Sequence, residues 1–433
     1  MMRSMYSAVS GLRTHQTKMD VIGNNIANVN TVGYKKGQMT FQEVFSQTVR
    51  GAGAAQGGKG GTNPQQIGLG VDAGSINTIH TEGASQRTDN PTDVMIDGEG
   101  FFVVTDDTNF ENRYYTRAGN FTVDGAGNLV TADGYKVLGY RANDNGEITE
   151  TYGPIVINRS ETIAATPTKT IELRGNLNPA NAKHTTDTII KDSLGNSWVV
   201  EFEFEKGTEK NTWTMSLKSI KSQDGKIEVG EDKAKLNGKT TITFGTDGKI
   251  EINEEDLKGV NLIIDNQIDN QNGATFGQEG KITIFDPNNP DSYNKMTQYA
   301  NDTDLKPHAI DGNSSGKLTG FAIDPSGTVN GIFSNGENKA LGQLMLAKFD
   351  NPMGLEKMGS NFFINTRNSG EPQYGTAGTS GFGAAKSGNL EMSNVDLSME
   401  FTEMITTQRG FQANSRIITA SDEMLQELVN LKR

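Results

Sequence analysis

The chain has 433 residues and a mass of 46.8 kDa, a length that suits about two to four domains of ordinary size. It contains no cysteine, which excludes disulfides, thiolate metal ligands and cysteine nucleophiles. Its formal net charge of -13 repels phosphate backbones and anionic lipid. We therefore expect no nucleic-acid partner and no membrane insertion.

A helical pattern opens the chain. Apolar residues alternate at spacings of four and three, Gln16 and Gly23 fill the two vacant heptad positions, and Ile22 widens the stripe. The first 50 residues are basic, which would suit a membrane surface or RNA but fits a solvated helix beside an acidic partner better. The predicted stripe consists of Met5, Val9, Leu12, Met19 and Ile26.

Two glycine-rich segments lie inside the terminal helical patterns. Residues 50–61 (RGAGAAQGGKGG) and 370–388 are typical of flexible connectors. The first approaches a phosphate-binding loop, but Gly60 stands where that loop needs Ser or Thr. Because these two segments lie symmetrically inside the terminal helical patterns, we expect the terminal helices to pair in space, with the middle of the chain looped out between them.

The middle of the chain predicts antiparallel β structure. Alternation with a period of two is combined with repeated Asp-Gly and Asn-Gly pairs, which favour tight hairpins. A βαβ pattern is absent from the sequence, which argues against a doubly wound sheet. Alternation places the acidic residues of one strand on its solvated face rather than in a general acid/base pair. In that strand Val200, Phe202 and Phe204 alternate with Glu201, Glu203 and Glu205.

Candidate metal sites fail on spacing. The histidines have no partner at the distance of a helical zinc motif. Asn143 to Gly146 resembles part of a calcium loop, but Arg141 and Tyr152 occupy ligand positions, so a hairpin turn is the better interpretation. We expect no metal, no cofactor and no catalysis. The histidines are His15, His80, His184 and His308.

The C-terminal helix is the most clearly patterned element. Ser393 and Asp396 have capping-box spacing before it, and a helix from Leu397 to Leu431 would be about 50 Å long. Polar residues interrupt its stripe, which weakens association while fixing register. The helix therefore needs partners, either the other terminal helix or further copies of the chain. Its stripe consists of Leu397, Phe401, Met404, Phe411, Ile418, Leu425 and Val429.

Both ends of the chain resemble one known family. Residues 7–35 and 388–415 are similar to the terminal signatures of bacterial flagellar axial proteins of the rod and hook. Residues 98–104 (GEGFFVV) and 115–121 (YTRAGNF) are similar to that family's shared β-domain motifs. The signature residues are Asn24, Asn25, Ile26, Ala27, Asn28, Gly33, Ser393, Asn394, Val395, Asp396, Gln408, Arg409, Gln412 and Asn414.

The resemblance implies a fold that is mainly β, with long N- and C-terminal α-helices. Paired helices would form an inner coiled-coil-like domain, with two antiparallel β domains looped out between them. The helical domain would span 1–34 and 389–433, the extended connectors 35–70 and 370–388, the inner β domain 71–142 and 316–369, and the outer β domain 143–315.

The inserted region carries no motif that we can assign, but its length resembles that of the extra outer β domain that hook members have and the shorter rod members lack. The resemblance implies a structural subunit of a helical tube of about eleven protofilaments that transmits torque as a flexible joint. Its implied partners are the hook cap, distal rod and hook–filament junction proteins, the type III export gate and a length-control protein. A distal rod protein and a secreted β-rich adhesin stay as alternatives.

The resemblance also implies where the protein works. It would be exported by the flagellar type III route without a cleaved signal peptide and would function outside the cell. The segment from Phe41 to Phe45 resembles the short export segment of early substrates.

Overall fold

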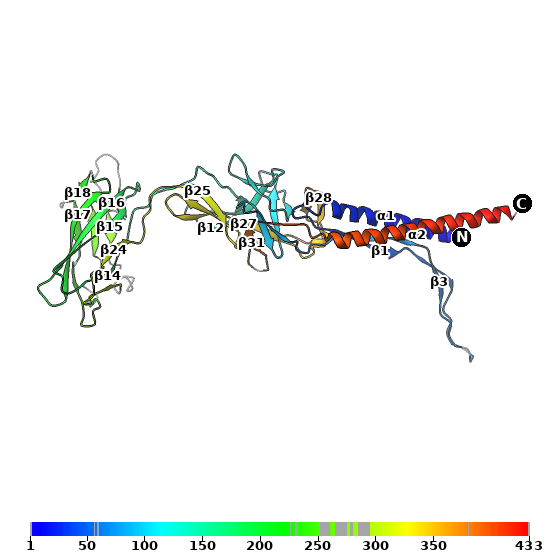
Figure 1. The fold of residues 1–433 in the computed structure, drawn as a ribbon, viewed down its shortest axis with the longest axis horizontal. Helices are drawn as coiled ribbons and strands as arrows, with labels where there is room; N and C mark the ends of the chain where they lie inside the picture. The colour runs from blue at the N-terminus through cyan, green and yellow to red at the C-terminus, as the bar shows by residue number, and fades with distance from the viewer. Residues whose placement is uncertain are drawn as a thin grey trace. The chain divides into compact units, whose positions relative to one another are not determined.

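The computed structural model describes residues 2–55, 57–58, 60–225, 227–229, 233–238, 240–251, 260–264, 275–277, 280–284, 295–379 and 381–431 (Figure 1). It divides the chain into two compact units. Unit 1 comprises Met1–Asn158, Phe321–Gly331 and Lys339–Arg433, and unit 2 comprises Arg159–Gly320 and Ile332–Asn338. The chain passes between the units after Asn158, in β25 (Gly316–Ile323), in β26 (Thr328–Phe333) and after Asn338.

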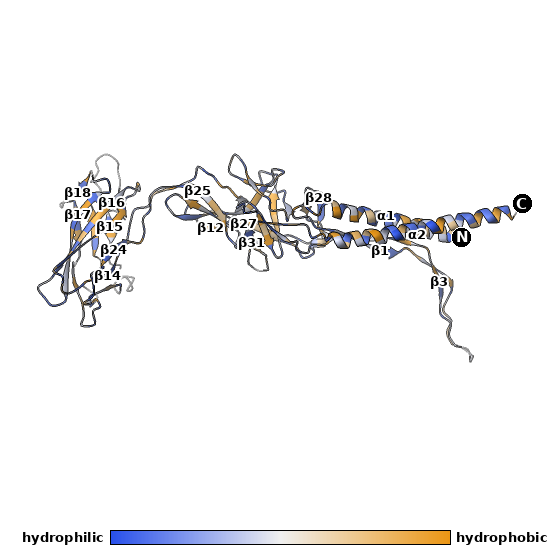
Figure 2. Cartoon of the chain, viewed as in Figure 1, coloured by the Kyte–Doolittle hydropathy of each residue, from blue (hydrophilic) through white to orange (hydrophobic). Residues whose placement is uncertain are grey.

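Unit 1 contains two long helices, α1 (Met2–Ala27) and α2 (Leu397–Asn430), that pack side by side. Figure 2 shows hydrophilic and hydrophobic residues alternating along both. The helices are antiparallel, because Gly11 lies against Asn414 and His15 lies against Gly410. The predicted pairing of the terminal helices is therefore confirmed.

The start of α2 differs from the predicted capping box. Asp396 itself is the N-cap, and its carboxylate accepts hydrogen bonds from the backbone N–H groups of Ser398 (2.8 Å) and Met399 (3.3 Å). The Ser393 hydroxyl instead accepts a bond from the N–H of Val395 at 3.4 Å. The capping box fails because Ser393 lies three residues before the true cap.

An antiparallel sheet forms the centre of unit 1, with neighbouring strands in the order β27, β11, β7, β8, β29 and β28. Aromatic side chains fill its core, among them Phe101, Tyr115, Phe349 and Phe363. The strands are β5 (Ser85–Arg87), β6 (Val94–Asp97), β7 (Phe101–Thr105), β8 (Tyr114–Thr116), β9 (Thr122–Val123), β10 (Leu129–Val130), β11 (Lys136–Ala142), β12 (Ile148–Pro154), β27 (Asn338–Lys348), β28 (Glu356–Gly359), β29 (Phe362–Ile364), β30 (Gln373–Thr376), β31 (Ala384–Ser387) and β32 (Asn389–Glu391), with a 3-10 turn at Pro352–Gly354.

The segments expected as extended connectors contain strands. Within 35–70 and just after it, β1 (Gly37–Glu43) pairs with β4 (Val71–Thr78), and β2 (Ser46–Arg50) pairs with β3 (Gln65–Gly68). A bridge between Gly53 and Thr62 continues the second hairpin into the glycine-rich stretch. In 370–388, β30 joins β27 and β31 joins β6. Backbone pairing explains the difference, because composition alone does not reveal a partner strand.

Unit 2 is built mainly from antiparallel strands around its own core, and β14 and β23 form a parallel pair. β15, β16 and β17 form consecutive pairs, and β14 pairs with β24. The unit begins at Arg159 rather than at residue 143, because β12 pairs with β11 of unit 1. The strands are β13 (Thr162–Ile163), β14 (Ile171–Asn176), β15 (Lys183–Lys191), β16 (Ser197–Lys206), β17 (Thr212–Ser222), β18 (Glu228–Val229), β19 (Ala234–Asn237), β20 (Thr241–Thr243), β21 (Asn261–Ile264), β22 (Lys281–Thr283), β23 (Met296–Thr297) and β24 (Lys306–Ala309).

The two faces of β16 differ as its alternation predicts. Phe202 and Phe204 are fully buried in the core of unit 2. On the other face the Glu201 carboxylate lies 2.8 Å from the Lys218 ammonium. The acidic residues of this strand therefore belong to an ion-paired, partly solvated face.

Truncating the buried Phe202 to Ala should lower the free energy of unfolding of unit 2 by about 3–5 kcal/mol, because both transfer and cavity terms are lost. Ile189 of β15, which is 46% exposed, provides the control, and Ile189→Ala should cost less than about 0.5 kcal/mol. Urea denaturation followed by tryptophan fluorescence measures both, since Trp198 and Trp213 lie in this core. Equal effects of the two variants would contradict the assignment of the buried face.

Candidate functional site

The two helices meet along a seam that is polar for much of its length. On α2, Glu400, Thr407 and Ser421 are buried, and Asn414 falls in the same series with a spacing of seven residues. We call the contact surface between α1 and α2 the helix seam. Its buried residues on α1 are Ala8, Gly11, Thr14, Ile22 and Asn25. With few large apolar side chains, the helix seam provides little hydrophobic stabilisation.

Two glycines fix the register of the helix seam. A Cβ at Gly11 would lie 2.8 Å from the Asn414 side-chain nitrogen, and one at Gly410 would lie 2.7 Å from the His15 ring. Each glycine thus leaves the space that a larger side chain of the other helix occupies. A shift by one turn would place these side chains against Cβ atoms. The antiparallel register is therefore specified by the sizes of the side chains that face each other.

Polar contacts reinforce this register. The Lys18 ammonium lies 3.1 Å from the Glu403 carboxylate, and the Asn25 amide donates to Glu400 at 3.1 Å. Lys36, just beyond α1, lies 3.9 Å from Glu400. Basic groups from the N-terminal segment therefore meet acidic groups of α2, the kind of acidic partner that the sequence suggested for the basic N-terminus.

The structure separates the predicted stripe residues into two groups. In α2, Met404, Phe411, Ile418 and Leu425 are half-buried and share the spacing of the helix seam. Exposed positions are Val9 of α1 and Leu397, Phe401 and Val429 of α2. The remaining stripe residues of α1, which are Met5, Leu12, Met19 and Ile26, are half-buried.

Sequence reasoning missed the polar half of the helix seam. The polar residues that interrupt the predicted stripe at its heptad spacing are Gln408, Ser415 and Asp422, and all three are exposed. Glu400 and Thr407 take those places instead. The available signal was the repeat of small or polar residues every seven positions beside an apolar repeat of the same period.

Asn25, in the last turn of α1, organises the chain reversal that follows the helix. Its amide donates to the Gly37 carbonyl and accepts from the Gly37 N–H, both at 2.9 Å. The Tyr34 hydroxyl donates to the same Asn25 oxygen at 3.3 Å. Burial raises the pKa of Tyr34, and the nearby Glu400 carboxylate adds to this effect. Asn25 is 2% exposed, so these bonds replace the water that it has lost.

A buried ionic group joins the two ends of the chain to the β sheet. The Lys35 ammonium lies 2.6 Å from the Glu391 carboxylate, and both side chains are completely buried. Arg117 of unit 1 lies 3.5 Å from the other oxygen of Glu391 and donates to the Gly98 carbonyl at 2.8 Å. Lys35 also donates to the Thr81 carbonyl at 2.6 Å. We call Lys35, Arg117 and Glu391 the buried triad.

The chain around the buried triad is held by further signature residues. The Asn394 side chain accepts from the Lys36 N–H at 2.8 Å and donates to the Ile79 carbonyl at 2.8 Å. Gly33 has φ 68°, and a Cβ there would lie 2.5 Å from the backbone nitrogen of Ala118. Only glycine fits this close approach. The N- and C-terminal segments therefore reach the sheet side by side.

Most signature residues gather at the end of the helix pair nearest the sheet, while others stay apart. Gln408, Arg409 and Gln412 are exposed farther along α2, and Asn414 lies in the helix seam, while Ala27 is exposed as the last residue of α1. Asn24 accepts a hydrogen bond from Asn28 at 2.9 Å. The possible export residues Phe41 and Phe45 are 42% and 64% exposed in and after β1. The residues at or next to this end are Asn24, Asn25, Ile26, Asn28, Gly33, Ser393, Asn394, Val395 and Asp396.

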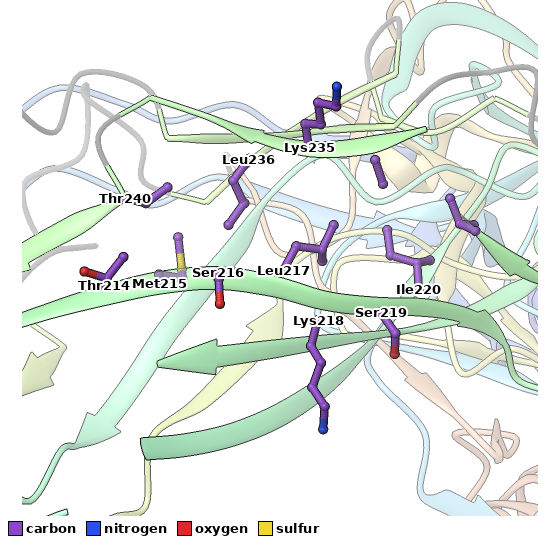
Figure 3. A pocket seen from close by; sticks show the side chains of 12 residues that line it. Thr214, Met215, Ser216, Leu217, Lys218, Ser219, Ile220, Lys235, Leu236 and Thr240 are labelled. Atoms are coloured by element: carbon purple, nitrogen blue, oxygen red, sulfur yellow. The ribbon is translucent and has the colours of Figure 1, made fainter. Parts of the chain in front are cut away.

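A hollow on the surface of unit 2 offers few groups that could take part in chemistry. This hollow of about 520 Å³ beside β17 and β19 has only Lys218 and Lys235 as titratable lining groups, and Figure 3 shows them pointing away from the apolar gap between the strands. Among residues placed in the structure, no group of His, Asp and Glu could hold a metal ion. None of the helices described is long and apolar enough to cross a membrane.

Four family models match the chain in succession. A flagella basal body rod protein model matches residues 5–35, and a flagellar hook protein FlgE/F/G D1 domain model matches 95–177. A flagellar basal body protein FlaE D2 domain model matches 158–313, and a flagellar basal body rod FlgEFG C-terminal model matches 386–431. The first and last of these cover the helix pair and the signature residues.

Full-length relatives agree with these models. The chain is 39% identical to the flagellar hook protein FlgE of Borreliella burgdorferi and 38% identical to that of Treponema pallidum, covering 100% of both chains in each case. It is 33% identical over all of the basal-body rod protein FlgG of Bacillus subtilis. The crystal structure of Helicobacter pylori flagellar hook protein FlgE2 shares the fold with a TM-score of 0.53 and 14% identity, covering 71% of this chain and 100% of that one.

Removing one member of the buried triad should be costly. Lys35→Met leaves Glu391 buried beside Arg117 alone, and we expect it to lower the free energy of unfolding of unit 1 by about 3–5 kcal/mol. Lys386, exposed and paired with Asp97, is the matched control, and Lys386→Met should cost less than about 1 kcal/mol. Chemical denaturation measures both, and similar losses would contradict the role of burial.

Unit 1 should lose stability in acid through His80. Burial lowers the pKa of His80 to about 4, and the positive charges of Lys35, Arg117 and Lys357 add to this effect. The unfolded chain therefore binds the proton first, so stability is complete above about pH 6.5 and declines by up to about 3 kcal/mol toward pH 4. His80→Phe should remove this part of the pH dependence in parallel denaturation curves. Identical pH profiles for both proteins would contradict it.

Proposed function

Because this chain belongs to the flagellar hook protein family, we propose that it builds the hook through its terminal helices. The observation that supports this proposal most directly is the similarity to flagellar proteins along the whole chain, including both ends that form the helix seam. The protein is a structural subunit of the bacterial flagellar hook and is not an enzyme. It works in the flagellum as part of a polymeric hook assembly.

Within that assembly, the helix pairs would line the inside of a tube of about eleven protofilaments, and the β units would stack around them. The weak helix seam supports this proposal. Its buried positions on α2 are polar, so the pair gains little by folding alone and more by packing among copies. The tube would transmit torque as a flexible joint and enclose a channel for exported subunits.

Export would precede assembly. A chain whose ends are weakly folded could pass through the flagellar type III route and order its helices in the polymer. Phe41 and Phe45 would be read by the export gate, and their exposure at 42% and 64% is compatible with that role. We propose that the subunit functions outside the cell and that no signal peptide is cleaved.

Further partners follow from the position of a hook between rod and filament. The ends of the tube would contact the distal rod protein and the hook–filament junction protein. A hook cap protein would guide the addition of subunits, and a length-control protein would stop it. The domain ranges proposed from the sequence are retained in outline, with the outer β domain corresponding mainly to unit 2.

Phe411→Asp should prevent polymerisation, because it places a charge among the half-buried apolar residues of α2. Phe411→Leu keeps an apolar side chain and should still polymerise. Purified chains concentrated with ammonium sulfate and imaged by negative-stain electron microscopy give the readout, and the denaturation curves of unit 2 report whether the β structure is intact. Normal tubes from Phe411→Asp would overturn the proposed role of the helices.

A further inference from the structure

Each helix of the pair has a second face that its partner does not cover. At 100° per residue, one exposed set on α1 lies opposite the helix seam. We call it the α1 back face, and it consists of Met2, Tyr6, Val9, Arg13 and Asp20. Apolar side chains occupy its N-terminal part, and Met2 and Tyr6 are 56% and 66% exposed.

The last third of α2 presents a similar exposed surface. Its residues are exposed, and several of them line an open surface hollow. We call it the α2 back face, and it consists of Arg416, Ala420, Glu423, Met424, Glu427 and Leu431. Met424 and Leu431 are 49% and 81% exposed.

The charges of the two back faces form complementary patterns with the same spacing. Arg13 and Asp20 are seven residues apart on α1, and Arg416 and Glu423 are seven residues apart on α2. If the helices run antiparallel, Arg13 meets Glu423 where Asp20 meets Arg416. If they run parallel, at most one of these pairs can form. None of the four makes an ion pair with another described residue of its own chain.

We propose, resting on the assembly function above, that the α1 back face of one copy packs antiparallel on the α2 back face of a second copy. In this register Tyr6 comes level with residue 430, next to Leu431, and Val9 comes level with residue 427, between Met424 and Leu431. The buried area comes from these residues, while the two ion pairs set orientation and register. The partner is a second copy of this chain.

The polarity of the contact agrees with growth into a tube. Within one copy α1 and α2 are antiparallel, so copies that point the same way also place α1 of one antiparallel to α2 of the next. The two faces differ, which makes the contact heterologous, and a heterologous contact propagates instead of closing on itself.

The register also implies an axial step between copies. Within a copy, the pairs Gly11–Asn414 and His15–Gly410 place Arg13 level with position 412 of its own α2. The proposed contact places it level with Glu423 of the second copy. The difference of eleven residues corresponds to about 16 Å along the helix axis.

Charge reversal tests the contact in the full-length protein. Arg13→Glu and Glu423→Arg should each raise the concentration needed for polymerisation at least tenfold, measured by sedimentation and electron microscopy. Asp422→Arg makes the same charge change one position earlier, about a quarter turn away from the α2 back face, and should polymerise like the parent chain. Circular dichroism shows whether helix content is kept, which is expected because all three side chains are exposed.

Rescue identifies the contact as one between copies. The double variant Arg13→Glu/Glu423→Arg should polymerise, and so should an equimolar mixture of the two single variants. Rescue by the double variant without rescue by the mixture would place the contact inside one chain and overturn the proposal. Unimpaired single variants, or no rescue at all, would also overturn it. A parent chain that forms no polymer would instead overturn the proposed assembly function.

Discussion

The buried triad is the constraint on which the arrangement of unit 1 depends. Lys35 follows the N-terminal helix, Glu391 precedes the C-terminal helix, and Arg117 belongs to the sheet between them. A charge buried without its counterion is strongly unfavourable, so none of the three segments can take its place without the other two. The position of the helix pair, and of every surface that it offers to another copy, follows from this condition.

The buried triad joins the two helices firmly to the sheet, whereas the helix seam between them is weak. The buried positions of α2 in the seam are Glu400, Thr407 and Ser421, while apolar residues such as Phe411 are only half-buried. Register is therefore specified by Gly11 and Gly410 more than by hydrophobic burial. A subunit built in this way holds its helices in a defined alignment, and in the assembly that we propose neighbouring copies supply most of their favourable packing.

The terminal helices, the β structure of the middle and the family could be predicted from the sequence, because they depend on local periodicity and on long motifs. The residues of the helix seam could not be predicted in the same way, since the choice between Gln408 and Thr407 as a contact position depends on which face of α2 meets α1. The hairpin of β2 and β3 was missed because glycine-rich composition hides backbone pairing. Glu391 gave no sign of its importance, because its partner Lys35 lies 356 residues away.

That separation has a kinetic consequence. A chain that emerges with its N-terminus first presents Lys35 long before Glu391. Until Glu391 appears, the helix that precedes Lys35 is not anchored to the sheet through the buried triad. Contacts of such long range form slowly, because the loop between them must be closed first. The buried triad therefore cannot be complete before residue 391 is available, so the N-terminal region finishes folding late.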